Sequence, residues 1–234
     1  MQEVFRIDLN GVNSYLGKQD GNYILFDTGG HMVLDKQFDN RYGALKTQLK
    51  AHGCTPDNLK LIVLTHGDND HAANASALRR EFGAKIAMHE NDRALVENPN
   101  IDMLMKTFNF QSVMLKLVLL IMKNQIRKIT VKTLDEYERF KPDIFLKDGE
   151  NLNKYGFDAK IYHLPGHTNG SIAILTSNNE LIAGDIFMGN KKPEIAMLAY
   201  DYNILKDSIK KIKTLGVKTV LPGHGNPFKM NQFK

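Results

Sequence analysis

The sequence has very few of the features that define several common classes of protein. It contains a single cysteine, Cys54, and no tryptophan. One cysteine excludes an internal disulfide framework and a zinc cluster built from thiolates, and a lone thiol is typical of the reducing cytosol. The stretch from Met1 to Leu9 carries Glu3, Arg6 and Asp8, so it lacks the apolar core of a secretion signal. We therefore expect a cytoplasmic protein.

Long apolar runs and a strong excess of one charge are also missing. The longest apolar stretch, Val113 to Met122, contains Lys116 and is far shorter than the roughly 20 residues that a membrane-spanning helix needs. The net charge of +5 comes from basic residues that are scattered along the chain. We expect no transmembrane segment, and the charge gives no clear indication of a nucleic-acid interface.

The composition is that of an ordinary folded protein. The chain has 234 residues, of which 42% are hydrophobic and 24% are charged. These values argue against disorder, and the length suits one domain with a well-buried core. We predict a single domain over residues 1–234, with a helical insertion at about 98–141 that is rich in Met, Leu and Lys.

Two strand-rich halves flank the helical insertion. Short apolar runs between turn residues predict strands at Val4–Leu9, Ser14–Gly17, Tyr23–Phe26, Leu61–Leu64, Lys85–Met88, Lys160–His163, Ser171–Leu175, Leu181–Ala183 and Thr219–Leu221. Helical spacing predicts helices at about Lys36–His52, Ala72–Phe82 and Tyr202–Thr214. Each half closes with a helix, which favours an α/β fold: a four-layer αββα sandwich of two mixed β-sheets flanked by helices.

Four residues of the kind that bind metals lie within one short loop after a buried strand. They are His66, Asp68, Asp70 and His71. Two carboxylates and two imidazoles so close together repel one another or need shifted protonation, whereas divalent cations turn this crowding into coordination. Gly67 gives the loop backbone freedom to aim the four side chains. The alternative is a polar surface loop with a helix N-cap at Asn69 or Asp70.

Three later segments repeat one pattern, in which a short strand is followed by a glycine-containing turn and one possible ligand. The three residues are His167, Asp185 and His224. Taken singly, each is compatible with an ordinary loop histidine or a turn-forming aspartate. Taken together, they favour a shared site, because the ends of strands on one edge of a sandwich converge in space.

At these residues the chain resembles the metallo-β-lactamase superfamily. The similarity rests on five elements in order: Phe26-Asp27-Thr28-Gly29, Thr65-His66-x-x-x-Asp70-His71, Pro165-Gly166-His167-Thr168, Gly184-Asp185 and Gly223-His224-Gly225. The resemblance implies one metal site formed by His66, residue 68 and His167, a second formed by Asp70, His71 and His224, and Asp185 as a bridge. The usual pattern has histidine at position 68, where this chain has Asp68.

The resemblance implies two divalent metal ions as cofactors, with zinc as the first choice. A carboxylate at position 68 makes that site harder and more anionic, so iron and manganese are alternatives. Asp27 is a candidate for accepting a hydrogen bond from a ligand histidine, which would fix its tautomer, or else for capping a strand-to-turn junction. Thr168 and Ser171 are candidates for steadying the loop that carries His167.

A binuclear site predicts hydrolysis by a bridging hydroxide. Two ions that share Asp185 also share a water and lower its pKa towards neutrality, and Asp70 is the candidate catalytic residue that orients this water or receives its proton. The glyoxalase II-like branch that the chain resembles implies a thioester, ester or lactone as the small-molecule substrate. The alternatives are a phosphodiesterase or nuclease, a non-catalytic metal-binding scaffold, and an iron redox enzyme. Asp185 in place of a bridging cysteine disfavours lactam hydrolysis.

The helical insertion and a pair of lysines are the candidates for recognising the substrate. Met and Leu side chains at helical spacing predict either a flexible lid over an apolar acyl group, or packing onto the body or a homodimer contact. Lys191 and Lys192 are candidates for holding a carboxylate or phosphate of the substrate, or are solvated surface residues. Met188 stands where lactonases that open acyl-homoserine lactones carry tyrosine, which weakens that activity.

Overall fold

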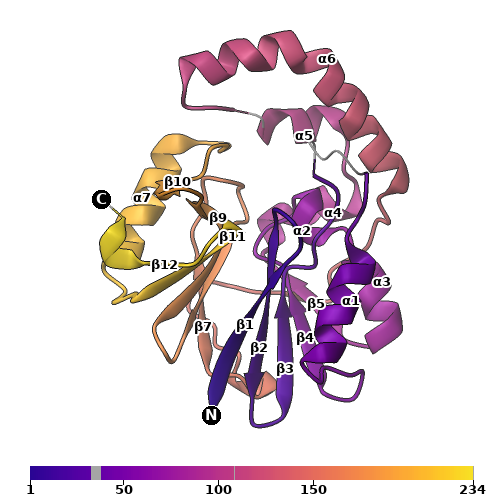
Figure 1. The fold of residues 1–234 in the computed structure, drawn as a ribbon, viewed down its shortest axis with the longest axis vertical. Helices are drawn as coiled ribbons and strands as arrows, with labels where there is room; N and C mark the ends of the chain where they lie inside the picture. Colours follow the sequence, from indigo (N-terminus) through magenta and orange to yellow (C-terminus); the bar gives the residue numbers. More distant parts are fainter. Residues whose placement is uncertain (33–37, 108, 234) are drawn as a thin grey trace.

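The first of two β-sheets is built from the N-terminal part of the chain. The computed structural model describes residues 1–32, 38–107 and 109–233 (Figure 1). The strands of the first sheet, in spatial and chain order, are β1 (Gln2–Asp8), β2 (Asn13–Gln19), β3 (Asn22–Phe26), β4 (Leu59–Val63), β5 (Lys85–Met88) and β6 (Ile144–Phe145). β1, β2 and β3 form an antiparallel meander, whereas β3 to β6 run parallel. The carboxyl ends of β3, β4 and β5 therefore meet at one edge.

The second sheet comes from the C-terminal part of the chain and has the order β12-β11-β9-β8-β7, with β10 paired to β9. Its strands are β7 (Ala159–His163), β8 (Ile172–Thr176), β9 (Glu180–Gly189), β10 (Pro193–Ile195), β11 (Thr219–Gly225) and β12 (Phe228–Lys229). β11 and β9 are parallel, while the other pairs are antiparallel. Both sheets are therefore mixed, as the sequence predicted.

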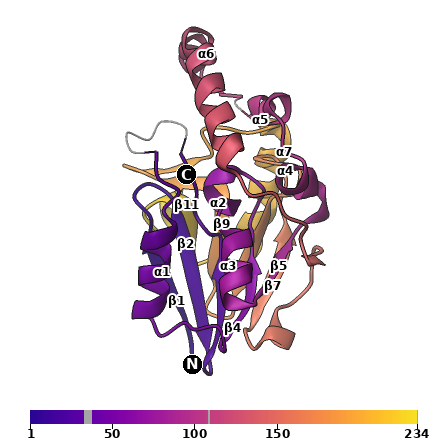
Figure 2. The same cartoon turned by 90° about the vertical axis from the view of Figure 1, so that its right-hand side faces the viewer.

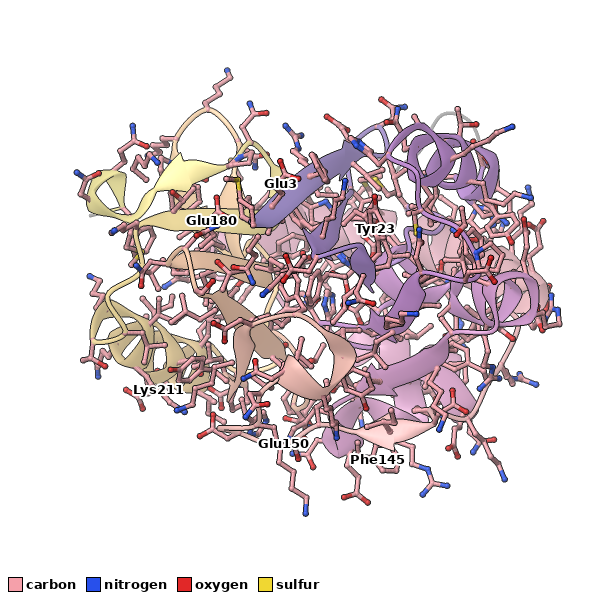
Figure 3. The ribbon with its side chains drawn as sticks, turned by 90° about the horizontal axis from the view of Figure 1, so that it is seen from below. Glu3, Tyr23, Phe145, Glu150, Glu180 and Lys211 are labelled. Carbon is pink, nitrogen blue, oxygen red and sulfur yellow. The ribbon has the colours of Figure 1, made fainter. Side chains whose placement is uncertain are left out.

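Three apolar clusters define four layers. The middle cluster lies between the sheets and includes Phe26 and Val63 from the first sheet and Ile174 from the second. The outer face of the first sheet packs against helices α1 (Tyr42–Ala51) and α3 (Ala75–Phe82). The outer face of the second sheet packs against α7 (Tyr202–Lys213). In Figure 3, Tyr23 and Glu180 mark one sheet each at the lower end of this sandwich. The predicted αββα arrangement is confirmed.

The helical insertion lies over one end of the sandwich. It contains α5 (Ile101–Thr107) and the long α6 (Val113–Glu136), which project beyond the sheets at the top of Figures 1 and 2. A short helix, α4 (Arg93–Glu97), leads into it. Within the described part of the chain, no helix combines the length and the apolarity needed to cross a bilayer. Phe108 lies outside the described residues.

Several predicted boundaries are wrong, and two of the differences concern the site. β9 continues to Gly189 and β11 to Gly225, so Asp185 and His224 lie inside strands and not in the turns that we predicted. Their pairing is irregular near Pro222, which explains why the glycine-rich sequence resembled a turn. The predicted loop before the second helix contains a short helix, α2 (Asn69–Ala72). The first helix begins at Tyr42, and its predicted start at Lys36 lies outside the described residues.

Candidate metal centre

The seven candidate ligands come from both sheets and converge at the edge below the helical insertion. His66 and Asp68 follow β4, and Asp70 and His71 lie on α2. The other three candidates, from the second half of the chain, are His167, Asp185 and His224. Main-chain pairing locks the two halves together, because the N–H of Ile172 donates to the carbonyl oxygen of Thr65 over 2.8 Å. The structure thus brings together residues that are up to 158 positions apart, from His66 to His224.

The first group of side chains surrounds Asp68. Oδ2 of Asp68 lies 3.1 Å from Nε2 of His167 and 3.7 Å from Nε2 of His66. Asp185 completes this group, because its Oδ2 lies 3.7 Å from Nε2 of His167. One donor atom from each of His66, His167 and Asp185 falls within 4.8 Å of the others, which is the spacing of a shared cation site.

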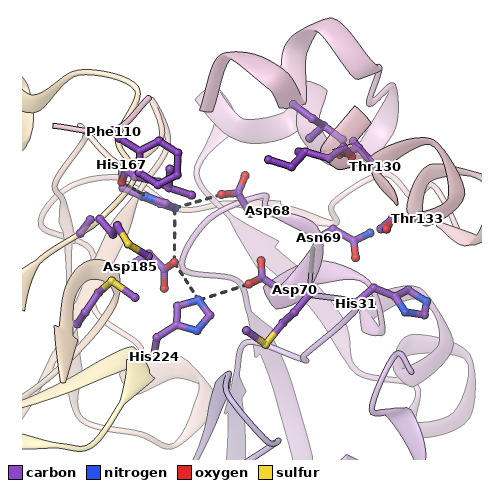
Figure 4. Close-up of a pocket in the computed structure, with 17 residues that line it drawn as sticks. His31, Asp68, Asn69, Asp70, Phe110, Thr130, Thr133, His167, Asp185 and His224 are labelled. Atoms are coloured by element: carbon purple, nitrogen blue, oxygen red, sulfur yellow. Dashed lines mark hydrogen bonds and ion pairs between the residues drawn. The ribbon is translucent and has the colours of Figure 1, made fainter. Parts of the chain in front are cut away.

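The second group surrounds His224. Its Nε2 lies 3.3 Å from Oδ2 of Asp70, 3.4 Å from Nε2 of His71 and 3.1 Å from Oδ2 of Asp185. Oδ1 of Asp185 lies 3.2 Å from Nε2 of His71. Asp185 therefore faces both groups, as the dashed contacts in Figure 4 show for His167 and His224.

Asp27 and Thr65 hold two of the histidines from behind. Oδ2 of Asp27 accepts a hydrogen bond from Nδ1 of His71 over 3.0 Å and another from the Thr65 hydroxyl over 2.7 Å. Because the Thr65 hydroxyl donates its proton to Asp27, it must accept from Nδ1 of His66, 2.9 Å away. Nδ1 thus carries a proton in both imidazoles, and Nε2 is the nitrogen directed to the site.

Backbone carbonyl groups hold the other two histidines in the same way. Nδ1 of His167 donates to the oxygen of Leu198 over 2.9 Å, and Nδ1 of His224 donates to the oxygen of Gly11 over 2.6 Å. A carbonyl oxygen only accepts, so these contacts fix the tautomer. All four Nε2 atoms therefore point to one small volume, where a metal ion that displaces their protons would find four nitrogen ligands.

The side chains of the site shift one another's pKa values strongly. Burial by itself raises the pKa of a carboxyl, yet His71 and His224 lower the pKa of Asp70 to about 2. Burial lowers the pKa of a histidine, yet Asp185 and Asp70 raise that of His224 to about 10. For His66, burial and the neighbouring His71 and His167 lower the pKa to about 4. The cluster thus holds Asp70 and Asp185 ionised, as carboxylate ligands of a metal must be.

Three buried atoms of the candidate ligands make no hydrogen bond. Among the described residues of the site, Nε2 of His66, Oδ1 of Asp68 and Oδ1 of Asp185 are enclosed without a hydrogen-bond partner. Leaving a buried polar atom unpaired costs free energy, so each such atom in a native protein needs an explanation. Coordination of a cation supplies one. With nitrogen and carboxylate donors only, the set fits zinc, iron or manganese.

Two glycines allow the close approach that the site requires. A Cβ at Gly223 would collide with Oδ1 of Asp185 and lie 2.7 Å from Cε1 of His71. A Cβ at Gly67 would lie 2.7 Å from Cβ of Leu95. Gly67 does not have the positive φ that our sequence argument assumed, so the need for glycine there is one of space and not of backbone freedom.

Asp92 joins the two halves of the site, and sequence reasoning missed it. The buried carboxylate accepts hydrogen bonds from the N–H of Gly67 over 3.0 Å, from the Thr168 hydroxyl over 2.6 Å and from the N–H of Gly170 over 2.7 Å. Burial raises its pKa to about 6. Its place just after β5, beside the strand that precedes the metal loop, was the available signal. The N–H of Thr168 also donates a hydrogen bond to Oγ of Ser171 over 3.0 Å.

A cavity of about 280 Å³ opens beside the candidate ligands (Figure 4). Its walls come mainly from apolar side chains: Met32, Leu104, Phe110, Ile126, Met188, Ala196, Met197 and Leu198. The helical insertion supplies Leu104, Phe110 and Ile126, so it covers the cavity. Lys191 and Lys192 are exposed and do not line the cavity, and Lys192 pairs with Glu194 over 3.3 Å. Their contact with a substrate stays a prediction.

Comparison with known proteins identifies the family. Residues 7–224 match the metallo-beta-lactamase superfamily model. A hydroxyacylglutathione hydrolase, GloC, of Haemophilus influenzae is 29% identical over 182 residues, which cover 76% of this chain and 74% of that protein. A beta-lactamase-like protein 2 homolog of Drosophila melanogaster is 25% identical over 221 residues, covering 93% of this chain and 60% of that protein.

Solved structures share the fold. The B3 metallo-beta-lactamase BLEG-1 superimposes with a TM-score of 0.68 at 23% identity and covers 98% of this chain and 95% of its own. TTHA1623 in a di-iron-bound form gives a TM-score of 0.63 at 20% identity, covering 94% and 91%. The chain belongs to the metallo-beta-lactamase superfamily, and it is a hydrolase with that fold.

Proposed function

We propose that this protein is a binuclear metal-dependent hydrolase that cleaves a thioester, ester or lactone with an apolar acyl group. One observation carries the proposal: four imidazoles, each fixed by an oxygen acceptor at Nδ1, direct Nε2 towards three carboxylates in two groups that share Asp185. A structural role does not require four identical tautomers to converge. A pair of cation sites does.

The two groups assign the ligands of the proposed sites. The first cation is held by His66, Asp68 and His167, and the second by Asp70, His71 and His224; Asp185 is shared. Zinc is the first choice. Iron and manganese are the alternatives, because the additional carboxylate of Asp68 makes the first site harder and more anionic. When bound, such a pair of ions lowers the pKa of a water molecule to near neutrality and polarises the substrate carbonyl.

The side chains of the protein orient the reaction. Asp27 and Thr65 keep His66 and His71 in the tautomer that binds a cation. Asp70 lines the cavity, and its low pKa keeps the carboxylate ionised, so it is placed to orient the attacking water by accepting a hydrogen bond from it. The helical insertion covers the cavity and excludes bulk water from the acyl group.

The walls of the cavity support the proposed substrate class. Apolar side chains from the helical insertion and from the segment 196–198 line the cavity beside the ligands, which suits an acyl chain. Similarity to a hydroxyacylglutathione hydrolase supports a thioester. The structure offers no lysine on the cavity wall among the described residues, which disfavours a strongly anionic substrate group at that wall.

Metal analysis combined with a substrate panel tests the proposal. We expect two divalent ions per chain by mass spectrometry of the purified protein, and hydrolysis of acyl thioesters, esters or lactones that chelation abolishes. Asp68→Ala should lose one ion, while Asp57→Ala, on the surface, should keep both. Unchanged stoichiometry and affinity in Asp68→Ala would show that Asp68 is no ligand. Activity on phosphodiesters alone would replace the substrate class, and bound metal without turnover would indicate a scaffold.

A further inference from the structure

We propose that the first half of α6 docks on an anionic lipid surface. Six large apolar side chains of this segment are exposed, and we call them the apolar tip: Val113, Met114, Leu117, Val118, Leu120 and Ile121. The exposed fraction reaches 68% for Leu120 and 84% for Ile121. Isolated exposed apolar residues are common on proteins, but a contiguous group of this size marks a surface that is covered by a partner.

Packing onto the body does not account for the apolar tip. The side of α6 that faces the protein carries Leu115, Leu119, Met122 and Ile126, at the spacing of successive helical turns, and each is partly or fully buried. The apolar tip lies on the other side of the same turns. The first half of α6 therefore carries apolar side chains on its inner and its outer side, interrupted by Lys116 and Lys123, which is the character of a helix in contact with lipid. Figure 2 shows that this part of α6 projects from the body.

The charges around the apolar tip indicate which kind of partner binds there. Between Val113 and Leu134 the helix carries five basic residues and no acidic one; the basic residues are Lys116, Lys123, Arg127, Lys128 and Lys132. Arg127 lies 3.6 Å from Asp102, and the remaining four are lysines. Apolar side chains combined with lysines are typical of helices that lie in the headgroup region of a bilayer, with the lysine stems reaching to anionic lipids.

A second copy of the chain fits this surface less well. Pairing two apolar tips would bring Lys116 and Lys123 of both helices together, and the first half of α6 has no acidic residue to balance them; like charges at short range oppose association. An anionic bilayer supplies the complementary charge, and each basic residue near such a surface contributes about 1 kcal/mol. Charge complementarity therefore favours lipid.

Docking at the apolar tip would place the cavity beside the bilayer. Ile126, Thr130 and Thr133, on the inner side of α6, line the cavity, so one helix contacts both the proposed lipid surface and the proposed substrate. This connection rests on the proposed function, since it gives an acyl substrate a short path from lipid to the site. The docking itself does not, because it needs only the exposed surface of α6.

Sedimentation with vesicles tests the proposal. The full-length protein is mixed with vesicles of phosphatidylcholine alone or with added phosphatidylglycerol, at low and high salt. We expect binding only to the anionic vesicles, and weaker binding at high salt. Leu117→Gln with Ile121→Gln, and separately Lys116→Glu with Lys123→Glu, should each lower the partition coefficient about tenfold or more. The matched control is Lys206→Glu with Lys213→Glu, which has the same spacing on α7 and should bind normally.

The results separate lipid from a second copy of the chain. Equal binding to both vesicle types, or none, overturns the proposal. The same holds if the Leu117→Gln, Ile121→Gln variant converts a dimer into a monomer in sedimentation equilibrium while vesicle binding stays absent. Circular dichroism and metal content report whether the variants fold and keep the site, so loss of lipid binding with full metal content isolates docking from the proposed hydrolysis.

Discussion

The Nδ1 atom of His71 lies 3.0 Å from Oδ2 of Asp27, a residue with a left-handed backbone conformation at φ 60°. Such a conformation is costly for a residue other than glycine and persists where surrounding contacts determine it. Here the N–H and hydroxyl of Thr65 both donate to the same carboxylate. Asp27 therefore controls two histidines of the proposed centre, one directly and one through Thr65.

Asp27→Asn should weaken metal binding while preserving the fold. An amide keeps the shape of the side chain but cannot accept all three hydrogen bonds, so the tautomers of His66 and His71 are no longer fixed. We expect metal affinity to fall about 10- to 100-fold, measured by competition with a chromophoric chelator. Asp57→Asn, on the surface, is the control. Equal affinities in the two variants would show that Asp27 serves only the local turn.

Gly223→Ala should distort the site by steric overlap alone. The added Cβ meets Oδ1 of Asp185 and Cε1 of His71, so the carboxylate that faces both groups must move. We expect at least a tenfold loss of metal affinity by the same competition assay, because a displaced ligand no longer reaches both groups. Gly43→Ala on α1, where a Cβ meets nothing within 4 Å, should keep wild-type affinity. A Gly223→Ala protein with normal metal content would contradict the observed close contact.

Asp92 should make the metal-free protein less stable as the pH rises. Burial raises its pKa from 3.8 to about 6, so the folded protein holds a proton there that the unfolded chain has lost. The contribution of this proton to the free energy of unfolding is complete below about pH 4 and is lost as the pH rises through about 6. The free energy of unfolding changes by about 3 kcal/mol over this range. Asp92→Asn removes this titration.

Denaturant unfolding at several pH values, in the presence of a chelator, measures the Asp92 effect. The difference in unfolding free energy between wild type and Asp92→Asn should shrink as the pH rises from about 4 to 6. The variant also loses hydrogen bonds to Gly67 or Gly170, so it should be less stable at low pH. A difference that does not vary with pH would rule out the raised pKa.

Cys54 should be unreactive in the folded protein. The thiol is buried, and burial raises its pKa to about 12, so the reactive thiolate is scarce at pH 8. We expect a disulfide reagent such as Ellman's reagent to modify it only as the chain unfolds, and to give one thiol per chain in guanidinium chloride. Fast stoichiometric modification of the native protein would refute the buried position.

Ile126→Ala should alter the choice of substrate under the proposed function. The change removes part of the cavity wall on α6, so long acyl chains lose apolar contact and short ones do not. We expect kcat/KM for long acyl thioesters to fall about tenfold, with little change for acetyl substrates. Val131→Ala, on the same helix and outside the cavity wall, is the control. Equal losses for all chain lengths would argue against an acyl-binding role for the helical insertion.

The order of elements and the residue types of the site could be predicted from the sequence. Alternating and continuous apolar runs predicted most of the strands, since a strand that is buried on both faces must be apolar on both. Local patterns failed where tertiary pairing extended an element, as in β9 and β11, whose glycines resembled turns. The resemblance to glyoxalase II-like thioesterases suggested that Lys191 and Lys192 hold the substrate, whereas in the structure neither lysine lines the cavity.

The sequence by itself determined the fold class and the seven candidate ligands, because apolar periodicity, the crowding of His66 to His71 and the strand-and-glycine pattern before the other three ligands are local properties of the chain. Only the tertiary structure decided what holds those ligands. The oxygen that orients His224 belongs to Gly11, 213 positions away, and the carboxylate that joins the loops of Gly67 and Gly170 belongs to Asp92. Such contacts depend on how distant strands come together, so no local pattern encodes them.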